Sequence, residues 1–102
     1  MEVAVGNYTG DGAATQAIAG VGFQPRFLIV YKQAGGAVEN KGYKFDVDGA
    51  EANVWVSGLL SWYYSVDHII SLDADGFTVG DGTGTVNTYN ILGIAYTYIA
   101  FS

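Results

Sequence analysis

The sequence contains no cysteine, a single proline and only four basic residues among its 102 positions. Without cysteine, thiol catalysis, thiolate zinc sites and disulfide cross-links are excluded. A domain of this length buries roughly 60–68% of the surface that its unfolded chain exposes, which is enough for one core without cross-links. We therefore expect a single domain that spans residues 1–102.

Basic residues are scarce relative to acidic ones, because four lysines and arginines face ten aspartates and glutamates, for a formal net charge of −6. Surfaces that follow a phosphate backbone need clustered lysine and arginine, so we expect no nucleic-acid partner. No segment approaches the ~18 apolar residues of a membrane helix, so no membrane partner is expected. The residues after Met1 also lack the basic and apolar regions of a secretory signal.

Short apolar or alternating segments, separated by glycine, asparagine and aspartate, run through the chain, and helical periodicity is nearly absent. This pattern predicts an all-β fold, which we interpret as an antiparallel β-sandwich of jelly-roll-like type. The expected strands cover residues 3–8, 15–19, 26–32, 43–47, 53–57, 68–72, 76–79 and 94–101.

Two of these strands and one turn carry more specific predictions. Residues 26–32 are apolar on both faces, which predicts a central strand. Residues 43–47 alternate aromatic and charged side chains, which is typical of an edge strand with one face in water. The turn at 73–76 predicts a hairpin between its two flanking strands. Residues 59–70 fit a strand by composition and a helix by the spacing of their apolar residues, and composition favours the strand.

Two aspartate pairs bring carboxylates close together, as a calcium ion would require. They are Asp46 with Asp48, and Asp73 with Asp75. Neither pair completes an EF-hand loop, and Asp-Gly is a favoured hairpin turn. The sequence favours the turn interpretation and leaves calcium open, so no metal site is assigned.

His68 is the only histidine, and it lies beside Asp67 and near three serines. No serine occupies a G-x-S-x-G elbow, so a packed histidine is favoured over a catalytic base. The glycine-rich residues 80–85 lack the lysine and helix that follow a phosphate loop, so they predict a connection. We therefore expect no enzyme activity, no catalytic residue and no cofactor.

Aromatic residues concentrate between positions 55 and 64. Tyrosine and tryptophan are enriched at protein interfaces, and their flat rings also stack on sugars. Burial in the core or an interface is favoured over a sugar platform. The residues expected to form this interface or ligand platform are Trp55, Leu59, Leu60, Trp62, Tyr63 and Tyr64.

Several short motifs occur in a fixed order: G-F-Q-P at 22–25, G-F-T-V at 76–79 and Y-T-Y-I-A-F at 96–101. Together with residues 10–18 and 86–87, they span about residues 10–101. This order resembles a widespread family of tailed-bacteriophage virion β-domains, which occur in capsid decoration proteins and in tail-fibre or receptor-binding proteins. The resemblance assigns turn geometry and packing, and no catalysis, to Gly22, Phe23, Pro25, Gly76, Phe77, Tyr96, Tyr98 and Phe101.

The resemblance implies a homo-oligomer, typically a trimer, located in the virion and assembled in the host cytoplasm. A tail fibre usually attaches through an N-terminal shaft, whereas this chain passes from Met1 directly into its first expected strand. We therefore expect a capsid decoration or cement protein that bridges subunits of the major capsid protein or of another virion protein. The alternative is a tail-fibre or tail-tip receptor-binding domain with a host surface glycan as its ligand.

Overall fold

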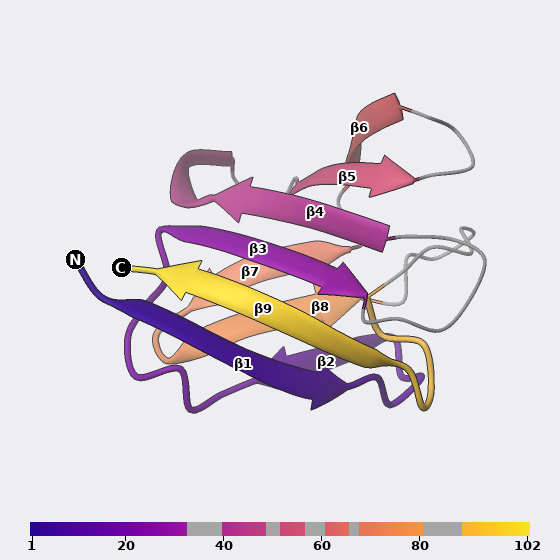
Figure 1. Cartoon of the computed structure of the whole chain (residues 1–102), viewed down its shortest axis with the longest axis horizontal. Helices are drawn as coiled ribbons and strands as arrows, with labels where there is room; N and C mark the ends of the chain where they lie inside the picture. The colour runs from indigo at the N-terminus through magenta and orange to yellow at the C-terminus, as the bar shows by residue number, and fades with distance from the viewer. Residues whose placement is uncertain (33–39, 49–51, 57–60, 66–67, 81–88) are drawn as a thin grey trace.

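The computed structural model describes residues 1–32, 40–48, 52–56, 61–65, 68–80 and 89–102, which form two antiparallel sheets lying one over the other (Figure 1). The larger sheet has six strands in the order β1-β9-β3-β4-β5-β6, and the smaller has three in the order β2-β8-β7. The strands are β1 (Val3–Thr9), β2 (Thr15–Ile18), β3 (Phe27–Lys32), β4 (Asn40–Phe45), β5 (Ala52–Val56), β6 (Ser61–Ser65), β7 (Ile69–Asp73), β8 (Gly76–Gly80) and β9 (Ala95–Phe101).

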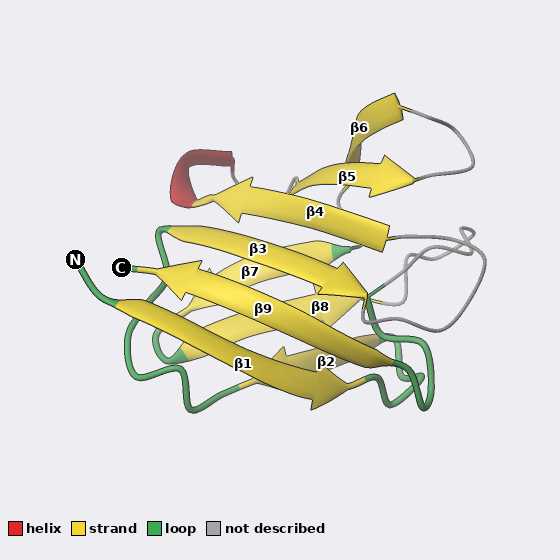
Figure 2. Ribbon diagram, viewed as in Figure 1, coloured by secondary structure: helices red, strands yellow, loops and turns green. Residues whose placement is uncertain are grey.

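The all-β prediction is confirmed, and the described chain contains one short helical turn, η1 (Asp46–Asp48), which follows β4 (Figure 2). Within the same residues, no helix has the length and apolar character that crossing a bilayer requires. β3 is central, as predicted, because it pairs with both β4 and β9. The predicted hairpin is formed by β7 and β8.

The ambiguous segment contains a strand, because residues 61–65 form β6 and pair with β5. Its composition was therefore the better guide, and the spacing that favoured a helix was misleading here. Residues 59–60 and 66–67 of that segment lie outside the described residues, and residues 69–70 belong to β7.

The core lies between the two sheets and is rich in tyrosine. Tyr96 stacks on Tyr8 with ring centroids 5.2 Å apart, and Tyr98 and Phe77 form a T-shaped pair with centroids 5.0 Å apart. Burial first, and then the neighbouring Tyr96 and Tyr89 phenols, raise the pKa of Tyr8, whose hydroxyl donates a 2.8 Å hydrogen bond to the Tyr89 carbonyl oxygen. The buried hydrophobic residues are Ile18, Val21, Leu28, Val30, Ile69, Phe77, Val79, Tyr89, Tyr96, Tyr98 and Ala100.

The prediction for residues 43–47 was wrong in two respects. β4 lies inside the larger sheet, between β3 and β5, and ends at Phe45. Within residues 43–45, Lys44 is 1% exposed and faces inward, whereas Phe45 is 43% exposed and faces outward. The alternation is real, but Lys44 faces the interior while Tyr43 and Phe45 lie on the opposite side of the sheet.

The turn between β7 and β8 holds the chain segment that precedes β3. The Asp75 carboxylate accepts hydrogen bonds from the backbone N–H groups of Gly20 and Gly22, at 3.0 and 2.7 Å. The next residue, Gly76, lies against the end of β2, where an added Cβ would be 2.9 Å from the Ile18 carbonyl carbon. A side chain at Gly76 would therefore push the two strands apart.

Gly76→Ala is expected to lower the free energy of unfolding by about 2 kcal/mol or more, because a backbone carbonyl cannot rotate away as a side chain can. Gly20→Ala serves as the matched control, since Gly20 has a positive φ of 83° and open space around it. Left-handed backbone strain alone should cost that variant about 1 kcal/mol. Urea unfolding measures both values, and equal losses in the two variants would contradict the steric explanation.

Candidate functional site

The outer face of the six-stranded sheet carries apolar side chains on four adjacent strands, β1, β9, β3 and β4. Strand residues alternate between the core and the outer face. On β3, for example, Leu28 and Val30 are fully buried in the core, while Phe27, Ile29 and Tyr31 occupy the outer face. From here on, "the outer face" means the outward-facing residues of β1, β9, β3 and β4.

The strand register aligns the outer-face residues in rows across the sheet. The first row is Val3, Phe101, Phe27 and Phe45, and the second is Val5, Ile99, Ile29 and Tyr43. The third row is Asn7, Thr97, Tyr31 and Lys41. Two complete rows therefore consist of apolar or aromatic residues only.

Phe27 is the hub of an aromatic cluster on this face. Its ring centroid lies 4.5 Å from that of Phe45, 5.6 Å from that of Phe101 and 5.9 Å from that of Tyr43. At the edge strand, Val5 is 68% exposed. Contiguous exposed apolar surface of this kind marks a site of interaction with another molecule.

Charge is nearly absent from the three rows. Lys41, at the end of the third row, is their only charged residue, although the chain carries ten acidic residues. The acidic residues of the described chain lie before β1, in turns, in η1 or at the end of β7. The outer face therefore differs in chemistry from the acidic loop ends of the molecule.

The predicted aromatic platform lies at the far margin of the same sheet. Trp55 lies in β5 opposite Trp62 of β6, and Lys41 of β4 is its partner on the other side. The backbone register thus continues the third row through positions 55 and 62, while Tyr63 and Tyr64 also lie in β6. Leu59 and Leu60 lie outside the described residues.

The residues of the resemblance motifs lie mostly where packing roles place them. Pro25, Phe77 and Tyr96 are fully buried, and Tyr98 is 8% exposed. Phe23 packs against the core from its edge, Gly22 has a positive φ of 98°, and Gly76 lies against β2. Phe101 instead lies on the outer face, in the first row.

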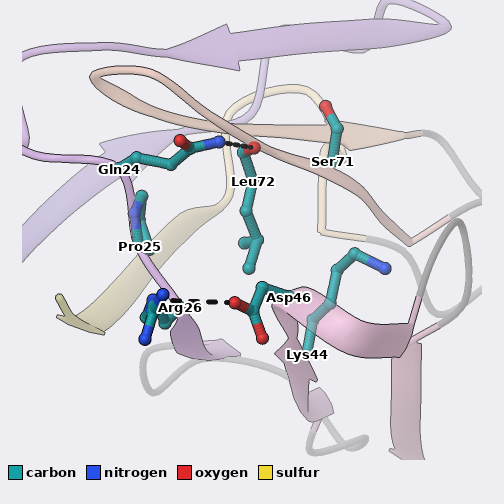
Figure 3. Close-up of a pocket in the computed structure, with 7 residues that line it drawn as sticks. All are labelled: Gln24, Pro25, Arg26, Lys44, Asp46, Ser71 and Leu72. Atoms are coloured by element: carbon teal, nitrogen blue, oxygen red, sulfur yellow. Dashed lines mark hydrogen bonds and ion pairs between the residues drawn. The ribbon is translucent and has the colours of Figure 1, made fainter.

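A pocket of about 370 Å³ opens between the segment before β3, the end of β4 and the strand β7 (Figure 3). Its polar contacts include a 3.8 Å ion pair from Arg26 Nε to Asp46 Oδ2 and a 3.1 Å hydrogen bond from Gln24 Nε2 to the Leu72 carbonyl oxygen. The sequence does not reveal this pocket, because its lining comes from three separate segments. The lining residues are Gln24, Pro25, Arg26, Lys44, Asp46, Ser71 and Leu72.

Asp73 and Asp75 hold the turn between β7 and β8 together. Asp73 Oδ1 accepts a 2.7 Å hydrogen bond from Ser71 Oγ, and Asp73 Oδ2 accepts one of the same length from Thr78 Oγ1. Asp75 binds the backbone of residues 20 and 22, as described above. Among the described residues, no group of three or more histidine, aspartate or glutamate side chains is placed to hold a metal ion. These contacts support the turn interpretation over a calcium site.

His68 packs inside the protein, in agreement with the packed interpretation. Its side chain is fully buried, and its ring meets that of Tyr89 edge-on with centroids 5.5 Å apart. Its backbone carbonyl oxygen also accepts a 3.0 Å hydrogen bond from Gly80 N–H. The histidine therefore packs against the core at the start of β7.

A cluster of polar groups around Asn90 joins the turn after β1 to the segment before β9. The buried Asn90 side chain accepts a hydrogen bond from Asp11 N–H and donates to Asp11 Oδ1 at 2.8 Å and to the Ala13 carbonyl oxygen at 2.9 Å. The hydrogen bond from Ala13 N–H, and next that from the Asn90 amide, hold the pKa of the Asp11 carboxyl below its ordinary value of 3.8. The ionised carboxylate is thus part of the folded junction.

Comparison with protein-family models, with curated proteins and with solved structures finds no match to this chain. The assignment of function therefore depends on the chemistry of its own surfaces. Among the described residues, the outer face is a surface feature that the packing of the core does not require.

The lowered pKa of Asp11 predicts a specific loss of stability in acid. A group whose folded pKa is depressed stabilises the fold fully above its unfolded pKa, and this contribution is lost as the pH falls through the folded value. Asp11→Asn should therefore be less stable than the wild type at pH 6, with the difference shrinking below about pH 3.8. Urea unfolding, followed by tryptophan fluorescence at each pH, measures it.

Glu2→Gln is the control, because it removes one acidic charge from the exposed chain terminus. A difference between wild type and Asp11→Asn that stays constant from pH 6 to pH 3 would contradict the role of the ionised carboxylate.

Proposed function

We propose that this protein is a structural component of a bacteriophage virion, a capsid decoration protein that self-associates and stabilises the shell by bridging capsid subunits. The observation that carries the proposal is the outer face, with two rows of apolar and aromatic residues and no acidic residue in a chain of net charge −6. Burial of apolar surface drives protein association, so this face suits a contact with another protein.

The order of motifs supports the virion setting. The residues that carry the resemblance lie at the entry to β3, in β8 and in β9. These segments build the core and, through Phe101, part of the outer face. The proposal places the protein in the virion, assembled in the host cytoplasm, with the major capsid protein or another virion protein as its partner. It also includes two finer expectations, a jelly-roll-like relation between the sheets and a trimeric assembly.

The proposed mechanism is binding to the assembled state, without a catalytic step or a cofactor. A protein that binds neighbouring shell subunits only when they are assembled shifts the equilibrium toward the intact shell. At a free concentration one hundred times the dissociation constant, each occupied site adds roughly 2.7 kcal/mol. Many weak contacts of this size, repeated over the shell, resist rupture by heat or internal pressure.

A tail-fibre or tail-tip receptor-binding domain is the second candidate. It is favoured by the register that pairs Trp55 with Trp62 at the margin of the larger sheet. Aromatic residues grouped at one edge suit the stacking of sugar rings. In that case the ligand is a host surface glycan, and the partner surface lies at β5 and β6.

Particles that lack this protein are expected to rupture at a lower temperature than complete particles, because the bridging contacts are lost. Adding the purified protein back should restore the rupture temperature, as measured by dye access to the packaged genome. Phe45→Lys should fail to restore it, since a charge is placed in the first row. Val47→Lys is the matched control, because Val47 is 86% exposed and lies in η1.

An unchanged rupture temperature would contradict the decoration role. If such particles instead fail to adsorb to the host, the receptor-binding candidate takes its place.

A further inference from the structure

We infer that the outer face packs against the same face of a second copy of this chain, related to the first by a two-fold axis. The inference rests on the proposed function in one respect, that the outer face is an assembly surface, and it names the partner. The two larger sheets would then lie face to face, with the smaller sheets on the outside.

The charge distribution favours a second copy as the occupant. In a two-fold contact the same patch meets itself, so any cluster of like charges in it is repelled. The three rows contain no acidic residue, and their one charged residue is Lys41, the β4 partner of Tyr31 in the third row. Contacts through the acidic turns would oppose association of two chains that each carry −6, whereas this face avoids that repulsion.

The polar residues at one end of the face are also compatible with burial. Thr97 Oγ1 donates a 2.9 Å hydrogen bond to Asn7 Oδ1 within the third row. This bond satisfies the Thr97 hydroxyl hydrogen and the Asn7 amide oxygen without a partner molecule. The remaining two rows are apolar except for the Tyr43 hydroxyl, so apolar contact from the second copy covers most of them.

The geometry of sheet packing fits this arrangement. Two sheets pack face to face about 10 Å apart, with their strands rotated by roughly 30° and their side chains interdigitated. The rings of Phe27, Phe45 and Phe101 form one contiguous cluster on the outer face. Phenylalanine, like tyrosine and tryptophan, is enriched in protein interfaces.

The area of the face suits a weak, concentration-dependent pair. The four strands that carry the three rows at about 4.8 Å spacing, with roughly six residues each at about 3.4 Å, give a face of roughly 19 by 20 Å. This is about 400 Å² from each copy, or about 800 Å² in total, which is below the roughly 1,200 Å² of stable interfaces and in the range of transient ones.

The test is the mass of the full chain in solution, measured by sedimentation over a wide range of concentrations. We expect an even number of chains, two, or six where the proposed trimer also forms. Val5→Lys and Phe45→Lys should each raise the dissociation constant at least about tenfold, which corresponds to about 1.4 kcal/mol. Val47→Lys and Leu92→Lys are the matched controls, because both residues are highly exposed, at 86% and 74%, and lie off the outer face.

Circular dichroism and thermal unfolding of each variant ensure that a change in mass does not reflect misfolding, and Val5, on the edge strand, tolerates lysine best. A wild-type monomer at all concentrations, an odd-numbered assembly, or folded Val5→Lys and Phe45→Lys variants that keep the wild-type mass would each overturn the inference.

The outcomes separate this inference from the proposed function. A monomeric wild type whose Phe45→Lys variant still fails to protect shells would mean that the face binds a shell subunit, so the decoration role stands and the inference falls. An even-numbered assembly whose loss leaves the particles equally resistant to heat would uphold the inference and contradict the decoration role.

Discussion

The packing of β9 between β1 and β3 is the interaction on which the rest of the structure depends. Its inward residues, Tyr96 and Tyr98, supply the aromatic centre of the core. Tyr98 lies across Gly6 of β1, where an added Cβ would be 2.6 Å from the ring carbon Cζ. Because strand residues alternate, fixing the tyrosines inward forces Ile99 and Phe101 outward. The alternation of residues along β9 therefore fixes both the aromatic centre of the core and the apolar residues of the outer face.

The unequal size of the two sheets explains where polar groups are found inside the protein. Because the larger sheet has six strands and the smaller sheet has three, the smaller sheet does not cover the whole inner side of the larger one. Lys44 lies on that inner side, almost fully buried, in the pocket that includes Ser71 and Leu72. The strand arrangement thus gives a charged residue, Lys44, a place on the inner side of β4. The aromatic residues Tyr43 and Phe45 of the same strand lie on the outer face.

Much of the fold was predictable from local pattern. The strands, the β7–β8 hairpin and the central place of β3 follow from alternation, turn residues and apolar runs. The direction in which β4 faces was not predictable, because Tyr43 and Phe45 alternate with Lys44 equally well in either orientation. The outer face was not predictable from local pattern, because its rows combine strands that are far apart in the sequence. The same is true of the junction between Asp11 and Asn90. Pairing between distant strands, rather than composition, creates the candidate site.

The pairing of β1 with β9 also brings the two chain ends together. The backbone N–H of Glu2 donates to Ser102 Oγ at 2.7 Å, and Ser102 N–H donates to the Glu2 carbonyl oxygen at 3.0 Å. Both ends therefore leave the molecule at one corner, directly beside the row that holds Val3 and Phe101. A short linker could join them and new ends be opened elsewhere, since circular permutation suits neighbouring termini. A bulky label fused to either end, by contrast, would stand next to the outer face and crowd whatever docks there.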